Sequence, residues 1–231
     1  MLGSAADHAT QAKVAHLILA GDSIHTPIIT SEESLSFTTR GQRERSDLGA
    51  PIRSFDGVAA ALAATVPVTV MTGPGDPGNY FLPQQPMVVS LFGTASRYPT
   101  YQSATNPVAL DVDGVTMLGS SGQPVTDTAK YSSLNDPVDI LAASLEWGHL
   151  APTAPDTLAS YPFYDRDPFV VTETPHVYFA GGQKAFGTRR IEGDDGQVCR
   201  LIAVPDWRET CEIVLLNLAT LEAHTVCFKV D

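Results

Sequence analysis

The sequence predicts an α/β fold in which sheets pack face to face between flanking helices. Strand and helix patterns alternate in the first part of the chain, where apolar runs at 14–20 and 66–71 enclose a helical pattern. The part after residue 175 is instead rich in strands, with five candidates separated by short turns. With 231 residues, of which 43% are hydrophobic and 17% charged, the chain is large and apolar enough for one globular domain.

Two strands with a helix between them are expected at the start. Residues 14–20 form a short apolar run that ends just before Asp22, which is typical of a buried strand with a polar residue at its carboxyl end. Residues 31–50 are polar and charged without periodicity, and predict a long exposed loop or insertion. Residues 55–65 are rich in alanine with apolar side chains near helical spacing, so a helix is expected there with Ser54 as its cap.

The second strand is expected at residues 66–71, where β-branched side chains precede the turn sequence Gly-Pro-Gly-Asp-Pro at 73–77. This places Asp22 and Asp76 at the carboxyl ends of two strands, which is where ligand sites form in open α/β sheets. Residues 109–118 then predict a hairpin, because an Asp-Gly pair separates its two halves.

The middle of the chain contains one clear helix signal and one glycine-rich turn. Asp136 and Pro137 form a strong helix start, and Gly148 is expected to cap the end of that helix. Residues 119–123 (Gly-Ser-Ser-Gly-Gln) look superficially like a nucleophile or phosphate loop, but a following helix and a lysine are missing from the pattern. We therefore expect a plain glycine turn after a strand.

In residues 149–169, prolines alternate with the rings of Tyr161, Phe163, Tyr164 and Phe169. Proline fixes φ and cannot donate a backbone hydrogen bond, so neither a long helix nor a central strand fits. A solvated linker would not contain four aromatic side chains within nine residues. The stretch therefore predicts an ordered loop, whose rings pack either on the chain's own core or on a partner. Its composition favours neither of these two alternatives.

Charge and cysteine content restrict the function classes. The 26 Asp and Glu residues outnumber the 14 Lys and Arg residues, which gives a formal net charge of −12. Such a surface repels phosphate backbones, so any contact with nucleic acid is expected to be made by a partner. The three cysteines show no CxxC spacing and predict free, buried thiols in a reducing compartment. We expect neither a secretory signal nor a membrane span, because no apolar run approaches roughly 18 residues.

Two interpretations of the acidic residues remain open on spacing alone. Asp22 and Asp76, with scattered histidines, could hold the ions of a two-metal hydrolase, because carboxylates and imidazoles suit divalent cations. Asp in Gly-Asp and Pro-Gly-Asp-Pro sequences also occurs in ordinary turns, where its side chain bonds to nearby backbone. The sequence contains no HExxH, P-loop, GxGxxG or GxSxG motif that would support catalysis.

Five segments resemble a known family. They are TGPGDPGNYFLPQQP (72–86), residues 105–133, HLAPTAPDTLASYPFYDRDPF (149–169), residues 175–189 and residues 201–221. Together they resemble the B-type second subunits of eukaryotic DNA polymerase delta and, more loosely, those of polymerases alpha and epsilon. The similarity extends from about Val14 to Phe228, and the LPQQP and APTAPDTL strings are long and specific.

The resemblance implies a calcineurin-like phosphoesterase fold, a two-sheet sandwich with flanking helices, in which the metal site is vestigial. Asp22 matches the acid of a Gly-Asp element, whereas Pro74 and Gly75 stand where active relatives have a ligand Asn and the catalytic His. Gly182 likewise replaces the first His of a GHxH turn. The positions of the vestigial site are Asp22, Gly75, Asp76, His149, Gly182 and Gln183. Because a binuclear site needs about four to six protein ligands, no catalytic residue, metal or cofactor is expected.

The implied function is that of a non-catalytic accessory and scaffolding subunit of DNA polymerase delta in nuclear DNA replication and repair. Its expected partners are the C-terminal domain of the catalytic subunit and a further regulatory subunit, with DNA contacted only indirectly and no membrane. The expected partner-binding residues are Tyr161, Phe163, Tyr164 and Phe169. The alternative is an active metal-dependent phosphodiesterase or exonuclease of the same fold, which would use Asp22, Asp76 and His149.

The resemblance also implies a domain organisation. Residues 1–13 are expected to be an N-terminal tail and residues 14–231 a phosphoesterase-like domain. The oligonucleotide/oligosaccharide-binding (OB) domain of such subunits is expected to be absent from this chain. The first strand of the phosphoesterase core is expected to be missing too, so the fold would be N-terminally incomplete. An unpaired sheet edge would result unless a partner covers it.

Overall fold

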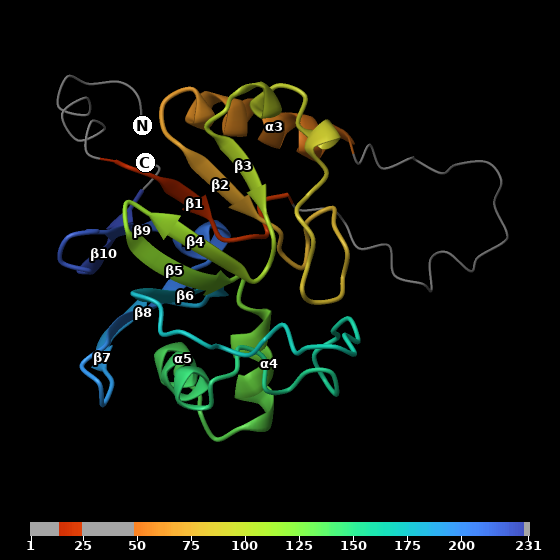
Figure 1. The fold of residues 1–231 in the computed structure, drawn as a ribbon. Coiled ribbons are helices and arrows are strands. Elements are labelled where there is room, and N and C mark those ends of the chain that lie inside the picture. The colour runs from red at the N-terminus through yellow and green to blue at the C-terminus, as the bar shows by residue number, and fades with distance from the viewer. Residues whose placement is uncertain (1–13, 25–48, 229–231) are drawn as a thin grey trace, which may run out of the picture.

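A computed structural model describes residues 14–24 and 49–228, which form a mixed α/β arrangement (Figure 1). The strands are β1 (Leu17–Leu19), β2 (Val68–Met71), β3 (Tyr101–Ala104), β4 (Val108–Val112), β5 (Val115–Ser120), β6 (Val177–Gln183), β7 (Gly187–Glu192), β8 (Val198–Pro205), β9 (Glu212–Leu216) and β10 (Ala223–Cys227). The helices are α3 (Gly49–Ala63), α4 (Gln123–Tyr131), α5 (Pro137–Glu146) and the short α6 (Trp207–Thr210), with single 3₁₀ turns η1 (Val89–Leu91) and η2 (Ala95–Arg97). The expected α/β class is confirmed.

The strands form two main sheets and a separate hairpin. β1, β2 and β3 lie side by side in parallel. The larger sheet has the order β4-β5-β6-β8-β7, in which β5, β6 and β8 are parallel and the outer strands β4 and β7 are antiparallel to their neighbours. β9 and β10 pair with each other in antiparallel fashion. Among the described residues, β1 is an edge strand.

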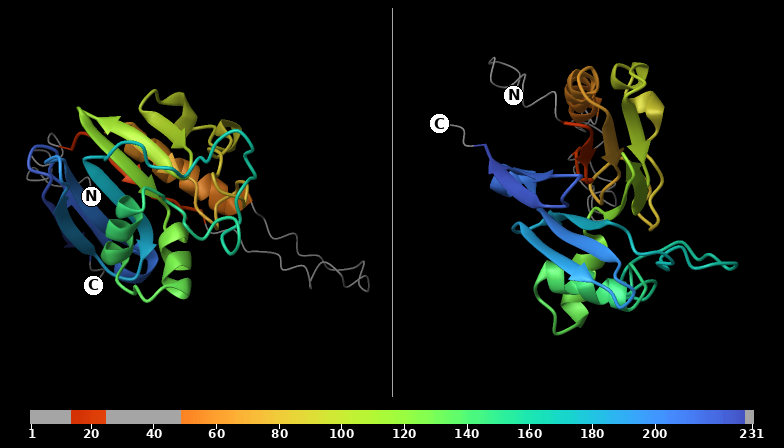
Figure 2. Two further views of the ribbon diagram at one scale, coloured as in Figure 1. Left: turned by 60° about the horizontal axis from the view of Figure 1, so that its bottom comes forward. Right: turned by 60° about the vertical axis from the view of Figure 1, so that its left-hand side comes forward.

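The two main sheets face each other, and helices cover their outer sides (Figures 1 and 2). Side chains alternate along each strand, as the pleat requires. On β2, Val68 and Val70 pack in the cluster that contains α3, whereas Met71 belongs to the cluster between the sheets. On β6, Phe179 joins Met71 between the sheets and Tyr178 packs with α4 and α5. The layers are therefore helix, sheet, sheet and helix.

Most strands occur near their expected positions. The apolar runs at 14–20 and 66–71 contain β1 and β2, and the hairpin at 109–118 is formed by β4 and β5. Its turn has φ values of 54° at Asp113 and 80° at Gly114, which fits a hairpin turn with two left-handed residues. The five strands expected after residue 175 are β6 to β10.

The helix start at Asp136 is confirmed. The Asp136 carboxylate accepts a hydrogen bond from the Val138 N–H at 2.8 Å and so caps α5. The end of α5 differs by one residue from the expectation. The C-cap is Trp147, and Gly148 follows it with a φ of 66°.

The helix expected at residues 55–65 is longer at its start. α3 begins at Gly49, so Ser54 lies inside the helix and does not cap it. This earlier start places a proline in the first helical turn. Proline is tolerated there because backbone N–H groups in the first turn have no intrahelical acceptor, so none is lost. Of the loop expected at 31–50, residues 31–48 lie outside the described residues, and the last two positions belong to α3.

The expectation that no helix follows the glycine turn at residues 119–123 is wrong. α4 begins directly after Gly122, which has a φ of 104°. Glycine adopts such a positive φ without the steric cost that other residues would have. Pro124 occupies the first turn of α4, and Val125 is buried in the cluster under the larger sheet. The arrangement is therefore strand, glycine turn and helix.

Two further expectations concern cysteines and membranes. All three cysteines are free, but only Cys199 is buried, whereas Cys211 is half-buried and Cys227 is exposed. Among the helices of residues 14–24 and 49–228, none is long and apolar enough to cross a membrane.

Candidate functional site

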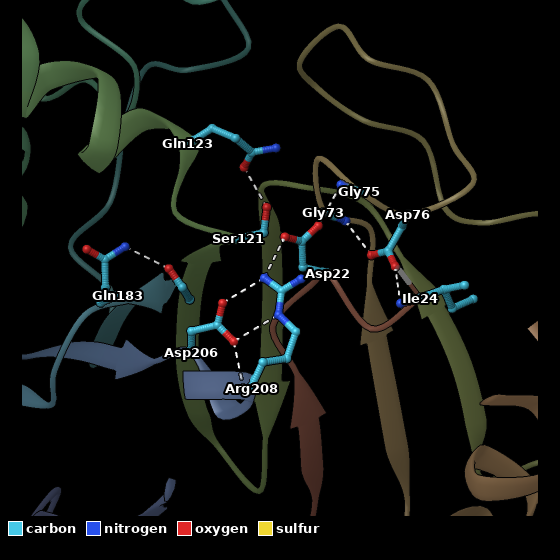
Figure 3. A network of polar contacts seen from close by, with 11 residues as sticks. Asp22, Ile24, Gly73, Gly75, Asp76, Ser121, Gln123, Gln183, Asp206 and Arg208 are labelled. Atoms are coloured by element: carbon cyan, nitrogen blue, oxygen red, sulfur yellow. Dashed lines mark hydrogen bonds and ion pairs between the residues drawn. The ribbon is translucent and has the colours of Figure 1, made fainter. Parts of the chain in front are cut away.

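The parallel strands of both sheets end at one place, and polar residues follow them (Figure 3). The residues just beyond β1, β2, β3, β5 and β8 include, in that order, Asp22, Asp76, Asn106, Ser121 and Asp206. Between these strand ends lies a cavity of about 330 Å³. Its walls include Asp22, Pro74, Ser121, Gln123, Gly182, Asp206 and Arg208. The cavity is thus where α/β sheets usually place a ligand.

Asp22 connects the turns after β1 and β2. Its Oδ1 accepts a hydrogen bond from the Gly75 N–H at 2.6 Å, and its backbone is left-handed with φ 56°. The two turns lie so close that a Cβ on Gly73 would be 2.2 Å from the Asp22 nitrogen. Glycine is therefore required at position 73 for the two strand ends to meet.

Arg208 lines the cavity and bridges two carboxylates (Figure 3). Its Nε and Nη2 donate to the two oxygens of Asp206 at 3.1 and 2.7 Å, and Nη2 also reaches Asp22 Oδ2 at 3.4 Å. Asp206 additionally caps α6 by accepting from the Arg208 N–H at 2.9 Å. These hydrogen bonds lower the pKa of Asp206 below its usual value and raise that of Arg208.

Asp76 is buried beneath the same turns. Its Oδ1 accepts from the Ile24 N–H and its Oδ2 from the Gly73 N–H, both at 2.7 Å. Burial nevertheless raises the pKa of Asp76 to about 6, and the nearby charge of Asp22 acts in the same direction. The side chain holds the turns together and is turned away from the cavity lining.

A buried amide network lies next to the cavity, and two of its members, Ser121 and Gln123, belong to the cavity wall. Asn106 Nδ2 lies 2.7 Å from both Gln84 Oε1 and Ser121 Oγ, and Asn106 Oδ1 accepts from the Ser121 N–H at 3.0 Å. Gln123 Nε2 donates to Gln84 Oε1 at 3.0 Å, and Ser121 Oγ donates to Gln123 Oε1 at 2.5 Å. Gln84 Nε2 donates outside this network, to the carbonyls of Gly73 and Asn79. The four side chains therefore all have partners, and they fix the positions of the strand ends.

The structure brings most of the expected site positions together. Asp22 and Gly182 line the cavity, and Gly75 and Asp76 are bonded to the same turns. Gln183 lies nearby, but it is buried and its Nε2 donates back to the Gly181 carbonyl at 2.7 Å. It therefore does not point into the cavity.

His149 lies apart from this group. Its Nε2 is 3.0 Å from Asp167 Oδ2, and its Nδ1 accepts from the Ala151 N–H at 3.2 Å. Its ring packs near Phe169, with 6.0 Å between the ring centroids. His149 is not part of the cavity lining. Its contacts instead connect residues of the proline-rich loop with one another.

These residues do not fit a two-metal centre. Both oxygens of Asp76 accept backbone hydrogen bonds, and those of Asp22 are engaged by Gly75 and Arg208. Pro74 and Gly182 offer no ligating side chain. Within the parts of the chain that the structure describes, no group of three or more His, Cys, Asp or Glu side chains could hold a metal ion. A binuclear site needs about four to six such ligands.

The aromatic residues of the proline-rich loop divide into two groups. Tyr164 is fully exposed, and Tyr161 and Phe163 are 61% and 37% exposed. Phe169 differs from the expectation of a partner-facing ring, because it is only 4% exposed and belongs to the core cluster under α5. Of the two open alternatives, core packing therefore applies to Phe169, and the other three rings lie on the surface.

The exposed rings are held in place by the neighbouring loop, and the segment around them is drawn in teal in Figure 1. Leu82 donates to the Ala159 carbonyl at 3.0 Å and accepts from the Tyr161 N–H at 2.7 Å. Tyr161 and Phe163 pack edge to face, with 5.2 Å between centroids. A shallow hollow beside them is lined by Asn79, Pro83, Gln85, Tyr161 and Phe163. Two loops far apart in sequence thus share one aromatic surface.

Several residues of the site are not foreseen from the sequence. The local pattern does not single out Asp206, and at Ser121 and Gln123 it predicts only a plain glycine turn. A signal for Gln123 does exist, because Gln-Pro directly after a glycine is compatible with a helix start. Nothing local to residues 206–208 indicates Asp22 as their partner, since 186 positions separate Asp22 from Arg208.

Comparison with known proteins identifies similar chains. Residues 2–188 match the family model that describes the B-type subunits of DNA polymerases alpha and epsilon. The chain is 41% identical over 228 residues to the DNA polymerase delta small subunit of Arabidopsis thaliana, covering 99% of this chain and 51% of that protein. It is 37% identical over 231 residues to DNA polymerase delta subunit 2 of Drosophila melanogaster, covering 100% of this chain and 53% of that protein.

A fungal relative shows the same relationship. The DNA polymerase delta small subunit of Saccharomyces cerevisiae is 33% identical over 217 residues, covering 81% of this chain and 44% of that protein. The chain thus spans about half the length of the curated relatives it matches.

Proposed function

Because the chain belongs to the family of B-type subunits of DNA polymerases alpha and epsilon, we propose that it acts as a non-catalytic accessory subunit of DNA polymerase delta in nuclear DNA replication and repair. The names of the plant, insect and yeast relatives support assignment to the delta type. Its work would be scaffolding, through contacts with the C-terminal domain of the catalytic subunit and with a further regulatory subunit.

We further propose that residues 14–231 form a calcineurin-like phosphoesterase domain that has lost its chemistry. Two facing sheets between helices, with polar residues at the carboxyl ends of the parallel strands, support this assignment. The loss of chemistry is supported by the donor set, in which Pro74 and Gly182 offer no ligand and Asp22 is paired with Arg208. The domain then serves as a rigid body that carries binding surfaces.

A hydrolysis assay tests the loss of chemistry. We expect no turnover of bis(4-nitrophenyl) phosphate above a buffer blank in millimolar Mn²⁺, because the site lacks the ligands to hold two cations. Asp22→Ala, which removes the acid that could still ligate, is expected to leave that background unchanged. A rate above the blank that Asp22→Ala abolishes would establish the alternative, a metal-dependent phosphodiesterase.

The observation that carries the scaffolding proposal is the exposed aromatic surface of Tyr161, Phe163 and Tyr164. Prolines restrict the loop, and its hydrogen bonds to Leu82 fix it before any partner arrives. Rigid rings on such a loop bury area on association at a small entropic cost. Aromatic residues are also enriched among the residues that dominate binding energies at protein interfaces.

Replacing the three exposed rings together tests this surface. We expect the triple alanine variant at Tyr161, Phe163 and Tyr164 to lose at least about tenfold in affinity for the C-terminal domain of the catalytic subunit, measured by quantitative pull-down. The matched control is Tyr131→Ala with Trp147→Ala, which removes two exposed rings from α4 and from the end of α5. Unchanged capture by the triple variant, with a native circular dichroism spectrum, would contradict the proposal.

A further inference from the structure

Arg208 connects the two sheets at the candidate site. Asp22 follows β1 of the three-stranded sheet, whereas Asp206 and Arg208 follow β8 of the five-stranded sheet. The guanidinium donates to Asp206 through Nε and Nη2 and reaches across to Asp22 through Nη2 (Figure 3). It is the only one of these three charged groups that is positive, so it joins two carboxylates from different sheets.

Every charged side chain of the cavity wall has an oppositely charged partner in the structure. Besides the group around Arg208, the lining contains Asp127 and Lys130, which lie 3.7 Å apart. Asp127 also accepts a hydrogen bond from Thr157 Oγ1 at 2.6 Å. Among the described residues, Arg208 is the only cation that forms an ion pair with Asp22 or Asp206, and both carboxylates line the cavity. Without Arg208 these two negative charges would repel each other, and solvent would weaken that repulsion only in part.

We propose that the Arg208 guanidinium is a built-in cation that occupies the place of a metal ion between these carboxylates. It neutralises them, ties the end of β1 to the end of β8 and makes the site independent of metal. The proposal goes beyond the scaffolding function, because it concerns how the chain stabilises its own cavity and is tested without any partner protein. Failure of the partner-capture experiment would leave it untouched.

The geometry suits arginine in particular. Two nitrogens of the planar guanidinium face the two oxygens of Asp206, and the second of these nitrogens also serves Asp22. A lysine ammonium is a point charge without this fork, so it would hold one carboxylate well and the second poorly. We therefore expect Arg208→Lys to retain only part of the stabilisation.

A double-mutant cycle on the whole chain tests the proposal. We expect Arg208→Met to lower the thermal unfolding midpoint by about 2–4 °C at low salt. Asp22→Asn in the Arg208→Met background is expected to restore part of that loss, because it removes the unpaired charge. The matched control is Arg189→Met, which breaks the exposed pair with Asp139 at 2.7 Å and has no connection with the cavity. Its effect is expected to be small and independent of Asp22.

Added cations provide the second measurement. Millimolar MnCl₂ and EDTA are both expected to leave the midpoint of the unchanged chain where it is, since the guanidinium already fills the position. MnCl₂ is expected to raise the midpoint of Arg208→Met, because the two carboxylates are then uncovered, and not that of Arg189→Met. The proposal is overturned if the effects of Arg208→Met and Asp22→Asn are additive, or if MnCl₂ stabilises the unchanged chain or fails to stabilise Arg208→Met.

Discussion

The carboxyl group of Asp76 stays protonated to a higher pH in the folded chain than in the unfolded chain. Burial raises its pKa from the ordinary 3.8 to about 6, even though the Ile24 and Gly73 N–H groups donate to it. Between these two pH values the folded state binds more protons than the unfolded state. The contribution of Asp76 to the free energy of unfolding therefore falls as pH rises through this window, and it is lost above about pH 6. The total change is of the order of 2–3 kcal/mol, from about 1.4 kcal/mol per pH unit.

Asp76→Asn isolates this pH dependence. The variant keeps one acceptor oxygen but cannot titrate, so the difference between its urea-unfolding free energy and that of the unchanged chain should vary between pH 4 and 6 and become constant above that range. The missing acceptor adds an offset that does not depend on pH. Asp113→Asn, in the exposed hairpin turn, is the matched control for the chemical change. Difference curves that stay flat from pH 4 to 7 would show that Asp76 does not carry the effect.

At the level of elements, the sequence predicts strands better than it predicts the turn before α4. The apolar side chains of β6 and β8 pack into two different cores. Tyr178 and Leu201 lie on one face of the sheet, and Phe179 and Ile202 lie on the other. Such doubly buried strands appear as continuous apolar runs, which are visible in sequence. α4 is more polar, and its buried face becomes apparent only once the larger sheet packs against it. The only local signal for the start of α4 is therefore the proline that follows Gly122 and Gln123, and apolar periodicity does not reveal the helix.

The pairing of β5 with β6 depends on a glycine. Gly119 lies opposite Phe179, and a Cβ added there would be 2.1 Å from the ring. We expect Gly119→Ala to lower the free energy of unfolding by about 1–3 kcal/mol, because the ring must move within the core between the sheets. Combining it with Phe179→Leu should cost less than the sum of the two single changes, as measured by denaturant unfolding. Gly57→Ala in α3, where no atom lies within 4 Å, is the matched control and should be neutral or stabilising.

At the scale of the whole molecule, the position of the site is predictable from the sequence but its composition is not. The strand ends at Asp22 and Asp76 indicate the right edge of the sheets, because parallel strands deliver their carboxyl ends together. Arg208 in α6 and Asn106 just after β3 complete the site, and the packing of the two sheets against each other determines their partners. Contacts between residues so far apart in sequence leave no local pattern. His149 is assigned to the same site by resemblance alone, and the loop places it elsewhere.

The charge of the whole molecule leads to a last prediction, on DNA. With 26 acidic and 14 basic residues, the chain has a formal net charge of −12, so it cannot gain from the release of counterions that drives binding to phosphate backbones. We expect no saturable binding of a short fluorescein-labelled duplex below about 10 μM at physiological salt, measured by fluorescence anisotropy, and little gain at low salt. A basic DNA-binding partner added to the same assay should restore binding, because it supplies the missing cations. Submicromolar affinity of the chain alone that weakens with salt would instead show a local basic surface strong enough to outweigh the total charge.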